Sequence, residues 1–355
     1  MTDSPAPAGI PPARHEPRRV VSGMRPTGKL HLGHFHGAVK NWIAISQKAD
    51  CFFFSADWHA LTTEYADPSK IEAATRDMFA DWVAAGLDPE KVTLFVQSRV
   101  KQHAELFLLL GMIASLGQLE RVPTFKEQQE ALREKDLATF GFLGYPVLQT
   151  ADVALYGADS VPVGQDQVSH LEFGRELVRR FNHLYAPELA DAKGKKHRQD
   201  VLVEARPLLT EVPKILGLDG RKMSKSYGNA IELGEEPESA RKRIMVAVTD
   251  PARVRRTDPG NPEVCAIYHL HRAYSPAAAV ERVNAECRTA AIGCVDCKKL
   301  LLTSLLPELE KHRAARAELD RNPARLDELV QLGTRKAGAV AEQTMEKVRA
   351  AMKLG

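Results

Sequence analysis

The chain has no long apolar segment. None of its apolar runs approaches the ~20 residues that a helix needs to cross a bilayer, and residues 1–19 lack the basic-then-apolar order of a secretion signal. Both absences argue against a membrane or secreted protein, so we expect a cytoplasmic location and no membrane partner. Disulfides are disfavoured in that compartment, and the five cysteines therefore need another explanation.

A large excess of charge of one sign is also absent. The formal net charge is only +3, so bulk charge does not indicate a nucleic-acid partner, although a local basic patch can. The chain has no internal repeat, and its one biased segment is the proline-rich start, residues 1–18, which we expect to be a disordered leader. A length of 355 residues predicts two domains, at roughly 100–200 residues each.

Short apolar runs alternate with helical patterns through the first half of the chain. Strands are predicted at residues 19–22, 51–54, 92–96 and 160–163, and helices at residues 33–47, 68–85 and 165–182. This alternation predicts an α/β fold with a Rossmann-like, doubly wound parallel sheet. We expect a catalytic domain over residues 19–212 with a helical insertion at about 103–140. A mobile loop region (213–234) and an α-helical C-terminal domain (235–355) follow.

A glycine-rich turn leads into the sequence His31-Leu32-Gly33-His34. Glycines let the backbone approach a ligand closely, and the helix that follows presents free N–H groups to a phosphate. The histidines can donate hydrogen bonds to phosphate oxygens, and Gly33 would leave a flat surface for an adenine ring. The motif follows the first strand, where doubly wound sheets bind nucleotides, and this favours a nucleotide site over an ordinary strand–turn–helix.

A polar loop further along the chain carries Lys222-Met223-Ser224-Lys225-Ser226. Two lysines around a small, hydroxyl-rich turn can close over a triphosphate and neutralise the charge that builds up on the α-phosphate. Taken alone, such a run is also compatible with a solvated lysine loop.

Together the two sequences resemble the HIGH and KMSKS motifs of class I aminoacyl-tRNA synthetases, with Leu32 in the isoleucine place. The resemblance implies that the chain binds ATP with Mg²⁺ and forms an aminoacyl-adenylate. It implies catalytic roles for His31, His34, Lys222 and Lys225. The ATP-binding residues that it implies are Gly23, Arg25, Gly33, His34, Gly164, Asp166, Lys222, Met223, Ser224 and Lys225.

The residues between the two motifs narrow the choice of amino acid. Asp152 is predicted to lie on a helix among apolar neighbours, where a carboxylate needs a partner. We interpret it as the acceptor for one polar hydrogen of an otherwise apolar substrate, with a helix-surface aspartate as the alternative. Several stretches resemble the bacterial tryptophanyl-tRNA synthetases: residues 56–63, 145–152, 161–167, 170–172, 180–182 and 250–256.

This second resemblance implies activation of L-tryptophan, its transfer to the 3′ end of tRNA(Trp), and a homodimer. The tryptophan-binding residues that it implies are Tyr145, Gln149, Asp152 and Gln167. Three positions depart from the usual pattern, because Gln165 is often glutamate, Gln149 often methionine and Arg25 often glutamine. A tyrosyl-tRNA synthetase stays an alternative, although a phenol needs a donor and an acceptor whereas indole offers only a donor. A non-catalytic, synthetase-like RNA-binding regulator is the other alternative.

Four of the five cysteines form a C-x21-C-x6-C-x2-C array: Cys265, Cys287, Cys294 and Cys297. Four thiolates suit zinc or a [4Fe–4S] cluster, and the spacing alone does not decide between them. The array resembles one that holds a [4Fe–4S] cluster in a subset of bacterial tryptophanyl-tRNA synthetases, which favours iron–sulfur over zinc. Basic residues around it predict a surface for tRNA phosphates: Arg241, Lys242, Arg243, Arg253, Arg255, Arg256, Lys298 and Lys299.

Overall fold

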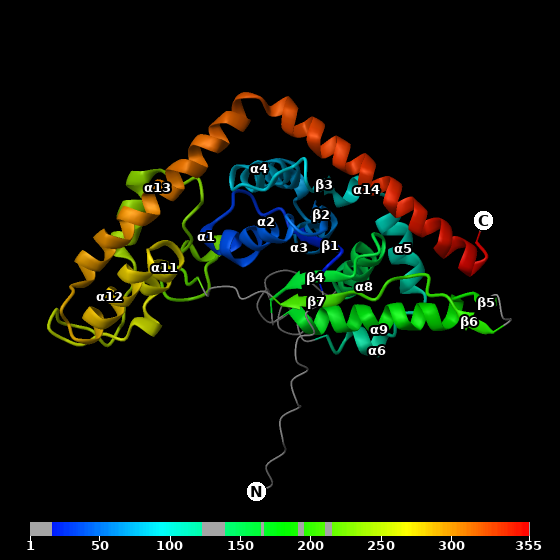
Figure 1. The fold of residues 1–355 in the computed structure, drawn as a ribbon, viewed down its shortest axis with the longest axis horizontal. Coiled ribbons are helices and arrows are strands. Elements are labelled where there is room, and N and C mark those ends of the chain that lie inside the picture. Colours follow the sequence, from blue (N-terminus) through cyan, green and yellow to red (C-terminus); the bar gives the residue numbers. More distant parts are fainter. Residues whose placement is uncertain (1–15, 123–138, 165–166, 191–194, 210–214, 355) are drawn as a thin grey trace, which may run out of the picture.

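The computed structural model describes residues 16–122, 139–164, 167–190, 195–209 and 215–354. Its centre is a sheet of five parallel strands in the order β3-β2-β1-β4-β7 (Figure 1). The strands are β1 (Arg19–Met24), β2 (Asp50–Ser55), β3 (Thr93–Val96), β4 (Ser160–Val163) and β7 (Arg206–Leu209). The chain starts in the middle and steps outward in both directions, which confirms the Rossmann-like α/β class.

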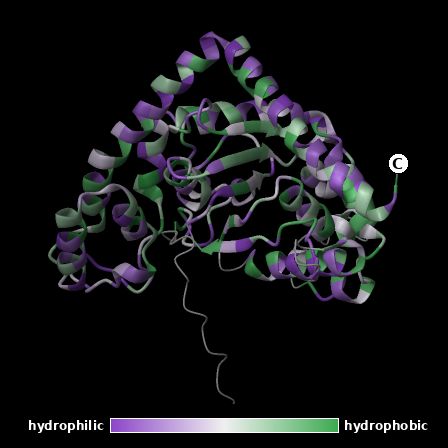
Figure 2. Cartoon of the chain, turned by 45° about the vertical axis from the view of Figure 1, so that its right-hand side comes forward, coloured by the Kyte–Doolittle hydropathy of each residue, from purple (hydrophilic) through white to green (hydrophobic). Residues whose placement is uncertain are grey.

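Successive residues of the inner strands enter two different apolar cores. In β2, Cys51 and Phe53 belong to one buried cluster, whereas Phe52 and Phe54 belong to the other. This alternation follows from the two-residue period of a strand. Both faces are covered, and the strand therefore reads as a continuous apolar run instead of an alternating one. Figure 2 shows hydrophobic residues along these central strands.

Strand β7 was not predicted from the sequence. It is an edge strand whose four residues are partly or fully exposed, so it carries no long apolar run. A small antiparallel pair, β5 (Glu188–Ala190) and β6 (Lys196–Arg198), was also not predicted and is fully exposed.

Helices cover both faces of the sheet. One core takes side chains from α2 (Lys40–Ile45) and α4 (Ile71–Ala84), and the other from α5 (Gln102–Gly111), α8 (Phe140–Ala154) and α9 (Val168–Tyr185). The shorter helices are α3 (Asp57–Glu64) and α6 (Leu116–Leu119). The predicted helix at 33–47 is observed as α1 (Leu32–His34), a π-helical turn η1 (Phe35–Val39) and α2.

The C-terminal region is helical, with α10 (Pro237–Val246), α11 (Ala266–Tyr274), α12 (Ala277–Arg288), α13 (Cys294–Arg321) and α14 (Pro323–Met352). The long helices α13 and α14 meet at an angle above the sheet (Figure 1). Helix α14 lies directly on edge strand β3, where a Cβ on Gly333 would be 2.0 Å from the Leu94 carbonyl oxygen. The helix thereby protects that sheet edge from pairing with another chain.

Within the described parts of the chain, every helix is too short or too polar to cross a bilayer.

Candidate active site

A cavity of about 370 Å³ opens at the carboxyl ends of β1, β2 and β4. This is the edge at which doubly wound sheets bind ligands, and the volume falls within the ~300–1,000 Å³ usual for small-molecule sites. Seven of the predicted site residues line it: Gly23, Arg25, Tyr145, Gln149, Asp152, Gly164 and Gln167. Predicted Asp166 and the variant position Gln165 lie outside the described residues.

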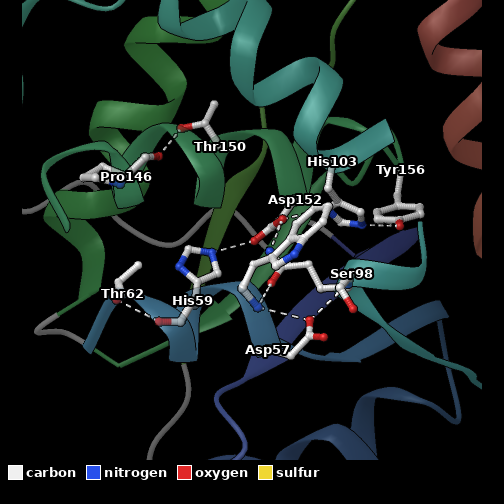
Figure 3. A network of polar contacts seen from close by, with 11 residues as sticks. Asp57, His59, Thr62, Ser98, His103, Pro146, Thr150, Asp152 and Tyr156 are labelled. Atoms are coloured by element: carbon white, nitrogen blue, oxygen red, sulfur yellow. Dashed lines mark hydrogen bonds and ion pairs between the residues drawn. The ribbon is translucent and has the colours of Figure 1, made fainter. Parts of the chain in front are cut away.

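Asp152 lies on α8 at this cavity and is only 2% exposed. Its Oδ1 contacts Gln97 Nε2 at 2.7 Å and His103 Nδ1 at 2.6 Å. Its Oδ2 contacts His59 Nε2 at 2.8 Å. Figure 3 shows His59 and His103 reaching the carboxylate from opposite sides. The alternative of a helix-surface aspartate is therefore wrong, because the side chain is buried and already partnered.

Burial alone would raise the pKa of the Asp152 carboxyl. The hydrogen bonds from His103 and His59 outweigh burial and lower that pKa to about 2. The group is therefore an ionised, acceptor-only carboxylate at neutral pH. An ionised acceptor at the side of a largely apolar cavity can bind one ring N–H of a ligand.

The rest of the cavity wall is mostly apolar, with Phe54, Val153 and Val161 among its lining residues. Tyr145 shares this wall, and its hydroxyl lies 3.0 Å from His170 Nδ1. Gly23 belongs here for a steric reason, since a Cβ at this position would lie 2.4 Å from the Phe54 ring. Such a wall suits a flat, apolar ring with a single polar point.

The two histidines of the first motif stack on one another, with ring centroids 3.6 Å apart. The His34 N–H donates to His31 Nδ1, so the proton of a neutral His31 ring is on Nε2, available for a ligand. Burial and the nearby Lys225 lower the pKa of His31 to about 4. Burial, His31 and Lys225 lower the pKa of His34 to about 3. At neutral pH both rings can donate hydrogen bonds but carry no charge.

The second motif is docked against the first. The Lys225 ammonium donates to the Thr27 carbonyl oxygen at 2.8 Å, and the Gly33 N–H donates to Met223 Sδ at 3.3 Å. A Cβ on Gly33 would lie 3.0 Å from the His31 ring and 3.4 Å from Met223. The His31 and Met223 side chains thus lie beside Gly33, and its role toward an adenine ring stays a prediction.

Asn229 shapes the second motif from within. Its side chain accepts from the Ser224 N–H at 2.8 Å and donates to the Lys222 carbonyl oxygen at 3.1 Å. Lys222 itself is exposed. The predicted site residues thus fall into two groups. One group lines the cavity, and the other belongs to the two motifs, which are docked against each other. Helix residues that follow the first motif, Gly37 and Asn41 among them, line the cavity and connect the groups.

Four residues of the Asp152 network were not predicted as site residues: His59, Gln97, His103 and Tyr156. His59 stands in a stretch quoted only for its resemblance, and the other three are fully buried. Gln97 could have been predicted as a site residue, because it directly follows the buried strand β3 at the edge of the sheet where ligands bind.

The four cysteines lie at the ends of three helices of the C-terminal region. Cys265 precedes α11, Cys287 is near the end of α12, and Cys294 and Cys297 lie in the first turn of α13. Burial first, and then the charges of the other three cysteines, raise the pKa of the Cys297 thiol to about 12, which indicates that all four lie in one neighbourhood. Within the described residues, however, no three His, Cys, Asp or Glu side chains are arranged to hold a metal ion.

The basic residues near the cysteines do not form one exposed set. Lys298 is buried and donates to the carbonyl oxygens of Met245 and Ala247 at 2.9 and 2.7 Å. Arg253 donates to those of Arg256 and Ile292 at 2.9 and 2.8 Å. Burial removes Lys298 from the predicted tRNA surface, whereas Arg253 is only partly buried and its role toward tRNA phosphates stays a prediction. Those left exposed are Arg241, Lys242, Arg255, Arg256 and Lys299.

Comparison with known proteins agrees with this geometry. The family model for tRNA synthetases class I (W and Y) matches residues 13–306. A tryptophan–tRNA ligase of Thermotoga maritima is 50% identical, and the match covers 95% of this chain and 99% of the relative. One of Ralstonia nicotianae is 45% identical, with 95% and 99% covered.

A solved structure is similar over almost the whole chain. It is the tryptophanyl-tRNA synthetase of Campylobacter jejuni, described as complexed with ADP and tryptophan, with a TM-score of 0.80 and 28% identity. The match covers 95% of this chain and 100% of that one. Fold and site thus define an aminoacyl-tRNA synthetase, which is a ligase. The chain belongs to the class I synthetase family of the tryptophan (W) and tyrosine (Y) enzymes.

Proposed function

We propose that the chain activates L-tryptophan with ATP, releasing pyrophosphate, and then transfers the tryptophanyl group to the 3′ end of tRNA(Trp). The observation that carries this proposal is Asp152, an ionised and buried acceptor on the wall of a mostly apolar cavity. The similar tryptophan–tRNA ligases support the same reaction. This role in protein synthesis implies a cytoplasmic location.

Asp152 fits tryptophan better than tyrosine. Indole has one polar hydrogen and no acceptor, so an acceptor-only carboxylate satisfies it completely. A phenol hydroxyl also needs a donor, and the donors around Asp152 are already directed at the carboxylate. Tyr145, Gln149 and Gln167 would complete the substrate site from the same cavity.

The ATP side of the site is assembled from both motifs. His31 and His34 would donate hydrogen bonds to phosphate oxygens as neutral rings, and Lys222 and Lys225 would neutralise the charge of Mg²⁺-bound triphosphate. Gly23, Arg25 and Gly164 lie where the cavity meets the strand ends, next to the expected α-phosphate. No covalent enzyme intermediate is required, since catalysis rests on positioning and electrostatics.

An ATP–pyrophosphate exchange assay with tryptophan and tyrosine in parallel tests the proposal. We expect exchange with tryptophan and little with tyrosine. Turnover with tyrosine alone would assign the chain to the other branch of its family. Exchange with no amino acid would favour a non-catalytic RNA-binding regulator.

An apolar surface supports the proposed homodimer. Four large side chains of α5, α6 and α8 are between 56% and 75% exposed: Leu108, Met112, Leu116 and Phe140. Leu108 and Met112 are four residues apart, so they share one side of the chain at α5 and the residue that caps it. We expect Met112→Glu to shift sedimentation toward the monomer. Val254→Glu, at another exposed apolar residue, is the control, and a wild-type monomer would refute the dimer.

We propose that the four cysteines supply the sulfur ligands of a [4Fe–4S] cluster, with zinc as the second choice. Four thiols from three helices share one neighbourhood, and Gly260 leaves room beside Cys287, since a Cβ there would lie 2.7 Å from its Sγ. A cluster would hold the ends of α11, α12 and α13 together beside the exposed arginines. Nothing in adenylate formation needs its redox chemistry, so its proposed role is to support tRNA binding.

Cys294→Ser tests the cluster, with Cys51→Ala as the control for a buried cysteine outside the array. We expect loss of iron and sulfide, weaker tRNA charging and retained pyrophosphate exchange. Zinc without iron in the isolated protein would favour the second choice. Unchanged charging after complete loss of the metal would remove the proposed role.

A further inference from the structure

Behind the cavity, Gln97 and His103 contact the Asp152 carboxylate, and Tyr156 contacts His103. Gln97, His103 and Tyr156 are each 0% exposed, and none of them lines the cavity. Gln97 directly follows β3, and His103 lies on α5. Tyr156 lies just beyond α8, the helix that carries Asp152. Figure 3 shows Tyr156 directed at His103 and His103 directed at Asp152.

When the His103 ring is neutral, the donor and the acceptor of each hydrogen bond in this network are fixed. An ionised carboxylate donates nothing, so His103 Nδ1 carries its proton and donates it to Asp152 Oδ1 at 2.6 Å. His103 Nε2 is then an acceptor, and the Tyr156 hydroxyl donates to it at 2.7 Å. Burial, together with the charge of Asp152, raises the pKa of Tyr156 well above its ordinary value, so this proton is retained.

Gln97 donates a second hydrogen bond to the same carboxylate oxygen, Asp152 Oδ1. Its Oε1 accepts from the Trp58 N–H at 3.1 Å, which turns its amide nitrogen toward Asp152 Oδ1 at 2.7 Å. Oδ1 therefore has two donors, which is its usual capacity. Among the described residues Oδ2 has one partner, His59, and Asp152 and His59 both line the cavity. The remaining acceptor position of the carboxylate belongs to Oδ2.

We propose that Tyr156 and His103 are positioning residues that set the selectivity for an amino acid with a single ring N–H. His103 and Gln97 occupy Oδ1, and Tyr156 orients His103. Together these contacts keep the carboxylate from turning and leave one acceptor position, on Oδ2, for the substrate. The inference rests on the proposed function and deepens it, because it assigns the selectivity to residues that do not touch the substrate. A ring without an N–H leaves the second acceptor position of Oδ2 unfilled, which costs binding.

The test compares tryptophan with its benzothienyl analogue, in which sulfur replaces the ring N–H. Pyrophosphate exchange gives kcat/KM for both amino acids in the wild-type chain, Tyr156→Phe and Tyr185→Phe. Tyr185 is the matched control, because its ring packs against the same apolar core as Tyr156. We expect Tyr156→Phe to lower the preference for tryptophan about 10-fold, through KM for the amino acid with little change in kcat or in KM for ATP.

Two variants of His103 extend the series. His103→Leu removes the donor to Oδ1 and should lower the preference by more than Tyr156→Phe does. His103→Asn places an amide N–H near the position of Nδ1, so it should restore part of the preference. A purely structural role would lower activity toward both amino acids alike. The ratio of the two is independent of the fraction of folded enzyme, so partial unfolding cannot imitate the expected result.

An unchanged preference in both Tyr156→Phe and His103→Leu would overturn this inference while leaving the proposed function standing. Absence of exchange with tryptophan in the wild-type chain would overturn both. An equal loss of preference in Tyr185→Phe would also contradict it, because Tyr185 is not among the described residues whose hydrogen bonds form the network.

Discussion

The polar cluster at Asp152 and the sulfur cluster in the C-terminal region differ in how far the chain satisfies them. The Asp152 carboxylate has three close partners within 2.8 Å, supplied by three segments. The cysteine sulfurs have weaker ones, with Arg253 Nη1 at 3.9 Å from Cys287 and His271 Nε2 at 3.4 Å from Cys297. The Asp152 carboxylate is buried, whereas of the four cysteines only Cys265 is buried and the other three are partly exposed.

The difference indicates what each cluster is for. The Asp152 cluster is complete except for one acceptor position, so it selects a small ligand by one N–H. The cysteine sulfurs have few close partners among the described residues, and as thiolates they would need the positive charge that a bound metal supplies. The Asp152 cluster serves substrate specificity, and the cysteine cluster has a proposed role in stability.

Removal of the proposed cluster should have the largest effect on stability. Chelation of the metal should lower the free energy of unfolding by about 3 kcal/mol, because metal binding and folding of the C-terminal helices are linked. Denaturant unfolding before and after chelation measures it. Cys294→Ser, which should hold no cluster, should not respond to the chelator. A wild-type chain that is equally indifferent would contradict the contrast.

Asp152→Asn should have the largest effect on substrate selection. The amide keeps the size but loses the charge and turns a donor toward one of its partners. We expect kcat/KM for tryptophan to fall about 100-fold, with KM for ATP little changed. Steady-state pyrophosphate exchange measures both. An equal loss in KM for ATP would show that the variant damages the whole site instead.

Acid should destabilise the Asp152 cluster in a defined range. The pKa of this carboxyl is lowered from an unfolded value near 3.8 to about 2, so its stabilising contribution is present above pH 4 and is lost as the pH falls toward 2. The difference in pKa corresponds to about 2 kcal/mol. Unfolding of wild type and Asp152→Asn across this range should show a steeper loss in the wild type. Parallel curves would argue against the ionised network.

Neighbouring lysines give a matched pair in the C-terminal region. Lys298→Met leaves two buried carbonyl oxygens without their donor and should cost roughly 1–2 kcal/mol of stability, with exchange unchanged. Lys299→Met, at an exposed residue, should leave stability unchanged and weaken tRNA binding in a salt-dependent way. Thermal unfolding and tRNA titrations separate the two. The reverse result would restore Lys298 to the tRNA surface.

Physical reasoning on the sequence predicted the fold and, in the cavity, Asp152. The other predicted residues that line the cavity came from the family resemblance. Continuous apolar runs such as residues 51–54 arise because both faces of the strand are buried. The edge strand β7 has no such run and was not predicted. Asp152 was predicted because a carboxylate among apolar residues needs partners. His103, which contacts Asp152, and Tyr156, which contacts His103, were not predicted. His103 is far from Asp152 in sequence, and neither residue belongs to a motif that would mark it.

The sequence also could not distinguish a lysine that binds phosphate from one that caps carbonyl groups. Lys298 and Lys299 are identical in type and adjacent, yet one is buried and the other exposed. Helix phase at the start of α13 decides this, and that phase depends on tertiary packing.

The central claim is that Asp152 selects its substrate by a single N–H. The most direct measurement is pyrophosphate exchange with tryptophan and with its benzothienyl analogue, in wild type and in Asp152→Asn. We predict a strong preference for tryptophan in the wild type and near-equal use of the two amino acids in Asp152→Asn. An undiminished preference in Asp152→Asn would contradict the account.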